Sequence, residues 1–92
     1  MTGRDMLTTA VEGGIGYWSR VNEYTDTYAV VTDVYDGTRY KVTAAGMTQA
    51  AKDVLRLYPK TEGAQYIRED NIDALAADMI FQVAALGTVV YG

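Results

Sequence analysis

The sequence contains no cysteine and no histidine. Without cysteine the chain cannot form a disulfide framework, so a hydrophobic core must hold the fold, which suits a reducing cytoplasm. Without either residue, the chain lacks the common ligands of zinc sites and the partners of Ser-His and Cys-His nucleophilic mechanisms. We therefore expect a protein that is not an enzyme, with no catalytic residues, no metal and no cofactor.

The chain also lacks a long apolar run and an excess of positive charge. No stretch reaches the roughly 18 apolar residues of a membrane span, and the N-terminus does not have the charged-then-apolar pattern of a signal peptide. The net charge of -4 disfavours direct nucleic-acid binding, because proteins that neutralise phosphates are usually basic. The sequence thus predicts a soluble intracellular protein with no membrane partner.

What the chain does contain is enough apolar material for one core. Of its 92 residues, 49% are hydrophobic and 22% are charged, a balance that argues against intrinsic disorder. A chain of this length forms one domain, here 1–92, because it is too short to build a second core.

The first segment predicts a short helix. Thr2 and Asp5 resemble a capping box, and an apolar stripe follows at Met6, Leu7, Ala10 and Val11. Gly13 and Gly14 come directly after the stripe, where a helix end favours residues that tolerate the left-handed conformation. A phosphate-binding loop needs the opposite order, with glycines between a strand and a helix, so we interpret these glycines as a helix end.

From Ile15 onward the apolar period changes to two. Segments rich in Tyr, Val and Thr predict strands over 15–24, 27–35 and 38–43. Short turns at Thr25-Asp26 and Asp36-Gly37 join them, so the sequence predicts a three-stranded antiparallel meander.

The second turn is consistent with two registers. A two-residue turn of Asp36 and Gly37 places Asp33 opposite Tyr40, among apolar residues. A three-residue loop with Gly37 in a bulge places Asp33 opposite Arg39, which is a favourable cross-strand pair. We predict the second register.

The predicted registers divide the strand side chains between two faces. The face expected to meet the core carries Tyr17, Val21, Tyr28, Val30, Val34, Tyr40 and Val42. The opposite face carries Trp18, Arg20, Tyr24, Ala29, Val31, Asp33, Arg39 and Lys41.

Two helices are predicted after the sheet. An apolar stripe from Met47 to Tyr58 predicts the first, which begins near Met47 because Gly46 weakens its start, and ends before Pro59. Residues 60–68 are predicted as a loop. A stripe from Ile72 to Val83 predicts the second helix, which ends near Gly87. Residues 89–91 could form a short edge strand. The predicted fold is α+β, with the meander packed against three helices in the order α-β-β-β-α-α.

Acidic residues gather around the start of the last helix, at Glu69, Asp70, Asp73 and Asp78. Carboxylates can bind a hard cation such as magnesium, but Asp73 and Asp78 are five positions apart and do not share a helix face. We interpret the group as a solvated helix start that the helix dipole favours. Asp33 is a candidate for acid-base chemistry, but its predicted pairing with Arg39 favours a surface ion pair.

The second sheet face combines flat aromatic area with positive charge in an otherwise acidic chain. The residues that do so are Trp18, Arg20, Tyr24, Arg39 and Lys41. Trp, Tyr and Arg are the residue types enriched at binding hot spots, so we predict these five as partner-binding residues. Three strands and three helices leave one helix free, so burial of this face within the fold is the alternative.

Three segments stand out as motifs: LTTAVEGGIGYWSRV, YAVVTDVYDGTRYKVT and IDALAADMIFQVAALGTVVYG. Together they resemble a set of short uncharacterised proteins of actinobacteria, their phages and their plasmids, which share EGG-x-x-YW, Y-x-V, A-D-x-I-x-Q and V-V-Y-G. In this chain the shared positions are Glu12–Gly14, Tyr17, Trp18, Tyr40, Val42, Ala77, Asp78, Ile80, Gln82 and Val89–Gly92. The resemblance implies no activity. It implies a small accessory protein of a mobile element in the cytoplasm of a bacterial host.

We therefore expect a non-enzymatic accessory protein of a phage or mobile element that binds a host or phage protein. Anti-CRISPR and anti-restriction inhibitors of host defence complexes are proteins of this size and context. One alternative is a structural or self-assembling protein, such as a homodimer joined through the same face or through 89–91. Another is nucleic-acid binding, or mimicry of nucleic acid by carboxylates, although the acidic residues are predicted to scatter over turns and helix ends.

Overall fold

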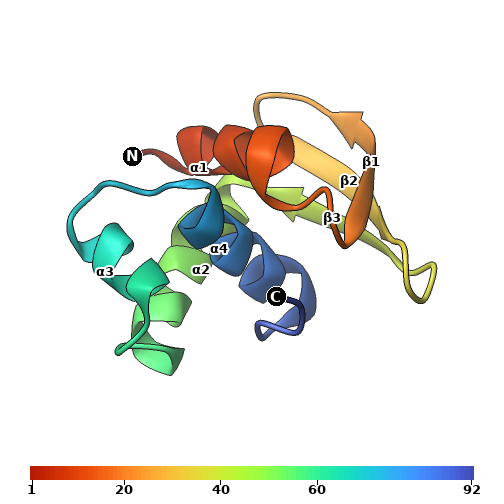
Figure 1. Cartoon of the computed structure of the whole chain (residues 1–92). Coiled ribbons are helices and arrows are strands. Elements are labelled where there is room, and N and C mark those ends of the chain that lie inside the picture. The colour runs from red at the N-terminus through yellow and green to blue at the C-terminus, as the bar shows by residue number, and fades with distance from the viewer.

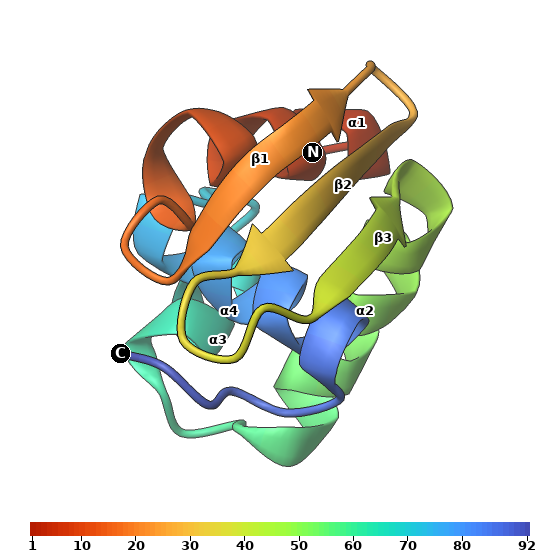
Figure 2. The ribbon, with the colours of Figure 1, turned by 90° about the vertical axis from the view of Figure 1, so that its right-hand side faces the viewer.

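Helices cover one face of a three-stranded antiparallel sheet in the computed structural model, which describes all 92 residues (Figure 1). The elements are α1 (Gly3–Thr9), η1 (Ala10–Gly14), β1 (Ser19–Tyr24), β2 (Tyr28–Asp33), β3 (Arg39–Thr43), α2 (Ala44–Leu57), α3 (Glu62–Arg68) and α4 (Ala74–Leu86). Figure 2 shows the strands in the order β1-β2-β3 in front, with the helices behind them. The predicted α+β class and meander are confirmed.

The helix count differs from the prediction because the segment predicted as a loop over 60–68 contains α3. The side chain of Thr61 accepts a hydrogen bond from the Ala64 N–H at 3.2 Å, which caps the first turn of this helix. Thr43 caps α2 in the same way, accepting from the Gly46 N–H at 2.9 Å, so α2 begins at Ala44 rather than near Met47.

The predicted capping box of α1 is present, since Thr2 and Asp5 exchange hydrogen bonds between side chain and backbone. The helix continues into the π-helical turn η1, which ends at Gly14. Neither Gly13 nor Gly14 has a positive φ, so the expected left-handed end is wrong. A Cβ added at Gly14 would come within 2.9 Å of the Ala74 carbonyl oxygen, so this glycine allows η1 to cross α4 closely.

Both predicted registers of the second hairpin are wrong. Residues 34–37 form a four-residue loop that sets Thr32 opposite Arg39 and Val31 opposite Tyr40. Gly37 adopts a left-handed φ of 76° within this loop, and no bulge interrupts the pairing of β2 with β3. In the first hairpin a bulge at Asn22 separates two registers, and Val21 lies opposite Val31.

A register change by one residue moves side chains to the other face, and this happened to β2. In β1, Arg20 and Val21 lie on their predicted faces, whereas the bulge at Asn22 places Tyr24 on the helical face. Ala29, Val31 and Asp33 point toward the helices and are buried, whereas Tyr28, Val30 and Thr32 alternate with them on the outer face. The assignment of β3 was right for Val42, which is buried, and for Arg39 and Lys41, which are exposed.

Helix α4 is the central element of the core, with seven buried residues from Ala76 to Val83. Asp73 caps its start by accepting from the Ala76 N–H at 2.9 Å, and Gly87 ends it with a φ of 84°, as predicted. The tail after Gly87 adds no strand to the sheet, so the predicted edge strand over 89–91 is wrong. The tail turns back beside the loop that joins β2 to β3 (Figure 2).

Candidate binding site

Asp78 on α4 joins the segment before β1 to the helical core. The indole N–H of Trp18 donates to its Oδ1 at 2.9 Å, and the Tyr17 hydroxyl donates to its Oδ2 at 2.5 Å. Gln82, one turn along the same helix, donates its side-chain N–H to Oδ1 at 3.1 Å. Only 5% of Asp78 is exposed, so this carboxylate is buried with three donors.

Gln82 also holds the C-terminal tail. Its Oε1 accepts hydrogen bonds from the backbone N–H groups of Val90 and Tyr91, both at 2.8 Å. Its Nε2 donates to the Tyr91 carbonyl at 3.0 Å. One buried amide therefore supplies the hydrogen bonds that a neighbouring strand would otherwise give this segment.

Tyr91 links the tail to the sheet. Its ring stacks on Trp18 at a centroid distance of 5.4 Å and on Tyr35 at 5.1 Å. Its hydroxyl donates to Asp33 Oδ2 at 2.6 Å, while Asp33 Oδ1 accepts from the Tyr35 N–H at 2.8 Å. We call the connected set the buried polar network, which comprises Tyr17, Trp18, Asp33, Asp78, Gln82 and Tyr91.

The protonation of this network is set by its own contacts. Burial, followed by the hydrogen bond to Asp78, raises the pKa of Tyr17 to about 12. The hydrogen bond to Asp33 is the main cause that raises the pKa of Tyr91 to about 12. Burial alone would raise the pKa of Asp33, but the hydrogen bonds from Tyr91 and Tyr35 lower it below its ordinary value. Both phenols therefore stay protonated at neutral pH and act as donors.

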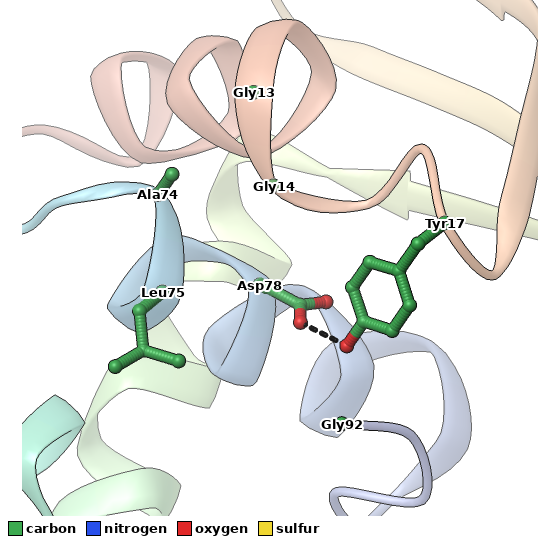
Figure 3. A pocket seen from close by; sticks show the side chains of 7 residues that line it. All are labelled: Gly13, Gly14, Tyr17, Ala74, Leu75, Asp78 and Gly92. Atoms are coloured by element: carbon green, nitrogen blue, oxygen red, sulfur yellow. Dashed lines mark hydrogen bonds between the residues drawn. The ribbon is translucent and has the colours of Figure 1, made fainter.

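A pocket of about 370 Å³ opens beside the network (Figure 3). Its lining residues come from η1, from the first turns of α4, from the segment before β1 and from the tail: Gly13, Gly14, Tyr17, Ala74, Leu75, Asp78 and Gly92. Figure 3 shows the hydrogen bond between Tyr17 and Asp78 on one side of the pocket, with Leu75 across from it.

Exposed apolar side chains continue from this pocket across the end of the sheet. We call them the tyrosine surface: Tyr17, Val34, Tyr35 and Leu75, with exposed fractions between 49% and 68%. The Tyr35 hydroxyl lies 3.5 Å from the Tyr17 carbonyl oxygen, and the Val34 N–H donates to the Trp18 carbonyl at 3.0 Å. Tyr17 and Leu75 line the same pocket, and Val34 and Tyr35 contact the backbone of the segment that carries Tyr17.

The five predicted partner-binding residues do not form one surface. Trp18 is fully buried, so its predicted place on an exposed face is wrong. Tyr24 lies opposite Ala29 on the helical face, and its hydroxyl is 2.7 Å from that of Thr8 in α1, so its predicted face is also wrong.

Arg20, Arg39 and Lys41 remain together on the outer face of the sheet. Arg20 and Arg39 flank Thr32 across the three strands. The Lys41 ammonium group lies 4.5 Å from the ring centroid of Tyr28. The predicted ion pair between Asp33 and Arg39 is absent, because Asp33 points inward to Tyr91.

The acidic group near α4 separates into different roles. Asp73 caps the helix, as the helix-start interpretation predicts, whereas Asp78 belongs to the buried polar network. No three His, Cys, Asp or Glu side chains gather closely enough to hold a metal ion, and no helix is long and apolar enough to cross a membrane.

Sequence reasoning missed Asp78, Gln82 and Tyr91 as site residues. One signal was available for the first two, because a polar pair one turn apart interrupts the most apolar helix of the chain. Their partners are about 60 residues away in sequence, at Tyr17 and Trp18. No local pattern connects such distant positions.

The motif residues that carry the resemblance converge in this region. Gly13, Gly14 and Gly92 line the pocket, and Asp78 and Gln82 join Trp18 to the tail. Compared with known proteins, the chain matches no protein-family model, no curated protein and no solved structure.

Proposed function

We propose that this is a non-enzymatic accessory protein of a phage or mobile element that binds a host or phage protein in the bacterial cytoplasm. The contact area in this proposal is the tyrosine surface. Tyr17 and Tyr35 support this proposal because both are exposed, yet Tyr17 is held by its hydrogen bond to Asp78 and Tyr35 by its stacking on Tyr91.

Rigid exposed aromatics favour binding because they offer apolar area at a low cost in conformational entropy. Tyr35 stacks on Tyr91, and Tyr91 in turn stacks on the buried Trp18. Tyr17 is fixed by its hydrogen bond to Asp78. Such pre-organised tyrosines are typical of binding hot spots.

Binding also suits the chemistry of the network better than proton transfer does. A general base must be free to accept a proton near neutral pH. The Tyr17 phenol has a pKa near 12, and the Asp78 carboxylate already accepts three hydrogen bonds within the protein. These groups position the surface and the pocket.

The outer sheet face is a second candidate surface for the same function. Arg20, Arg39 and Lys41 place three cations on one face of a chain with a net charge of -4. This arrangement favours an acidic partner. Positive charge on the edge strand β3 also discourages strand addition by other chains, so these side chains have a structural use of their own.

Quantitative capture from a bacterial host lysate, read by mass spectrometry, separates the two surfaces. Val34→Ser with Leu75→Ser changes the tyrosine surface, and Arg20→Ser with Arg39→Ser is the matched change on the outer face. We expect the wild type and the arginine variant to enrich the same host protein. The Val34→Ser, Leu75→Ser variant should fail to enrich it. Loss with the arginine variant alone would contradict the assignment.

Sedimentation of the purified protein tests the self-assembling alternative. We expect a monomer at micromolar concentration. If the wild type is a dimer and the Val34→Ser, Leu75→Ser variant is a monomer, the tyrosine surface binds a second copy of the chain. That result would overturn the proposal of a different partner.

A further inference from the structure

We propose that the pocket beside Asp78 binds a cation at the end of an apolar stem, the chemistry of a lysine or arginine side chain. That this side chain belongs to the partner protein rests on the proposed function. That the pocket binds such a cation follows from the residues that line it.

Asp78 carries a buried charge without a counter-ion. Asp78 is 5% exposed, yet none of the ion pairs in the chain involves it. Three hydrogen bonds offset the cost of burying this carboxylate, but no cation neutralises its charge. The only charged side chain that lines the pocket is this carboxylate.

One oxygen of the Asp78 carboxylate has spare acceptor capacity. Asp78 Oδ1 accepts from both Trp18 and Gln82, but Oδ2 accepts only from the Tyr17 hydroxyl. A carboxylate offers about four acceptor sites over its two oxygens. Oδ2 can therefore accept a further hydrogen bond from an ammonium or guanidinium group without breaking the network.

The walls of the pocket suit a cation that ends an apolar stem. Leu75, Ala74 and the ring of Tyr17 provide apolar contact for a stem, and the tyrosine ring also attracts a cation. The volume of about 370 Å³ is at the small end of the roughly 300–1,000 Å³ typical of ligand pockets. This size suits one side chain.

Asp33 serves as an internal comparison. It is also buried and without a cationic partner, and its two oxygens accept from the Tyr91 hydroxyl and from the Tyr35 N–H. It does not line the pocket. Only Asp78 combines a buried charge with access from outside.

Trp18 provides a direct reporter, because it is the only tryptophan and its indole N–H donates to Asp78 Oδ1. We would follow this N–H resonance by NMR while adding n-butylammonium or n-butylguanidinium chloride at constant ionic strength. Butyrate and n-butanol have the same stem and serve as the anionic and neutral controls. We expect a saturable shift at millimolar concentrations of the two cations, since one ion pair with a short apolar stem gives weak binding.

Two glycine variants provide the matched pair. A Cβ at Gly13 would meet only the Ala74 Cβ at 3.8 Å, so Gly13→Leu can fold and fills the pocket mouth. Gly16→Leu adds the same side chain where nothing lies within 4 Å. We expect Gly13→Leu to lose the saturable shift and Gly16→Leu to keep it. Asp78→Asn, which removes the charge at nearly constant size, should also lose it if the variant folds.

Three outcomes would overturn the inference: no saturation with either cation, equal shifts with butyrate, or unchanged binding by Gly13→Leu. Partner capture by the same variants separates the two proposals. If the cations bind but Gly13→Leu still captures the partner, the pocket takes a free amine and the assignment to a partner side chain fails. If no cation binds while capture persists, the pocket inference fails and the proposed function stands.

Discussion

Charged side chains are buried and hydrogen-bonded on the helical side of the sheet but exposed to water on its outer side. On the helical side, Asp33 and Asp78 are buried and accept hydrogen bonds from tyrosine and tryptophan side chains. On the outer side, Arg20, Arg39 and Lys41 are exposed to water. Exposed charges contribute little to stability because water competes for them, whereas a buried polar group that loses its partner is costly. Substitution of a charged residue should therefore reduce stability much more on the helical side than on the outer side.

The largest effect is expected for Asp78→Ala. The substitution leaves the Trp18 indole N–H and the Gln82 amide without their common acceptor, and the loss of unfolding free energy should be about 3–5 kcal/mol. Urea unfolding measures it. A loss of unfolding free energy below about 1 kcal/mol would show that the hydrogen bonds of Asp78 contribute little to the stability of the fold.

Gln82→Ala should have the next largest effect. The fully buried amide is replaced by a cavity and the N–H groups of Val90 and Tyr91 lose their acceptor, so we expect a loss of about 2–3 kcal/mol. Hydrogen exchange should show fast exchange of these two amides. Gln49→Ala, at an exposed position of α2, is the control and should change stability by less than about 0.5 kcal/mol. A tail that stays protected in Gln82→Ala would contradict this role.

Tyr91→Phe removes one hydroxyl and should destabilise the fold by about 1–2 kcal/mol at neutral pH. It should also change the alkaline response. The pKa of Tyr91 rises from 10.0 to about 12 on folding, so its contribution is complete below pH 10 and is lost as pH rises through 12. Unfolding between pH 9 and about 12 should therefore show a weaker pH dependence in the variant than in the wild type. An unchanged alkaline response would disprove the contact with Asp33.

The smallest effect is expected on the outer face. Arg39→Ala should change the unfolding free energy by less than about 0.5 kcal/mol, and Lys41→Ala by about 0.5 kcal/mol through loss of its contact with Tyr28. The same urea experiment measures both. A loss above about 1 kcal/mol for Arg39→Ala would remove the contrast between the two sides.

The features that sequence predicted correctly depend on neighbours along the chain. The capping box of α1 needs only Thr2 and Asp5, and Gly87 ends α4 by its own backbone conformation. The loop position of Gly37 is local in the same sense.

The strand faces were not predictable in this way, because β2 reads as apolar on both sides. Tyr28 and Val30 alternate with Ala29 and Val31, so a period of two does not choose between the faces. The inward face also carries Asp33, whose Oδ2 accepts from the Tyr91 hydroxyl, 58 residues later. The binding site depends on the same long-range contacts, and only the polar pair in α4 gave a local signal.

Hydrogen exchange of the Trp18 indole N–H is the most direct measurement of the buried polar network. This one proton joins the segment before β1 to α4, and no part of its side chain is exposed. We predict that it exchanges only through global unfolding, with the same free energy that urea unfolding gives. Exchange that is much faster than this would mean that the site opens locally, and would contradict a network that holds the tyrosine surface in place.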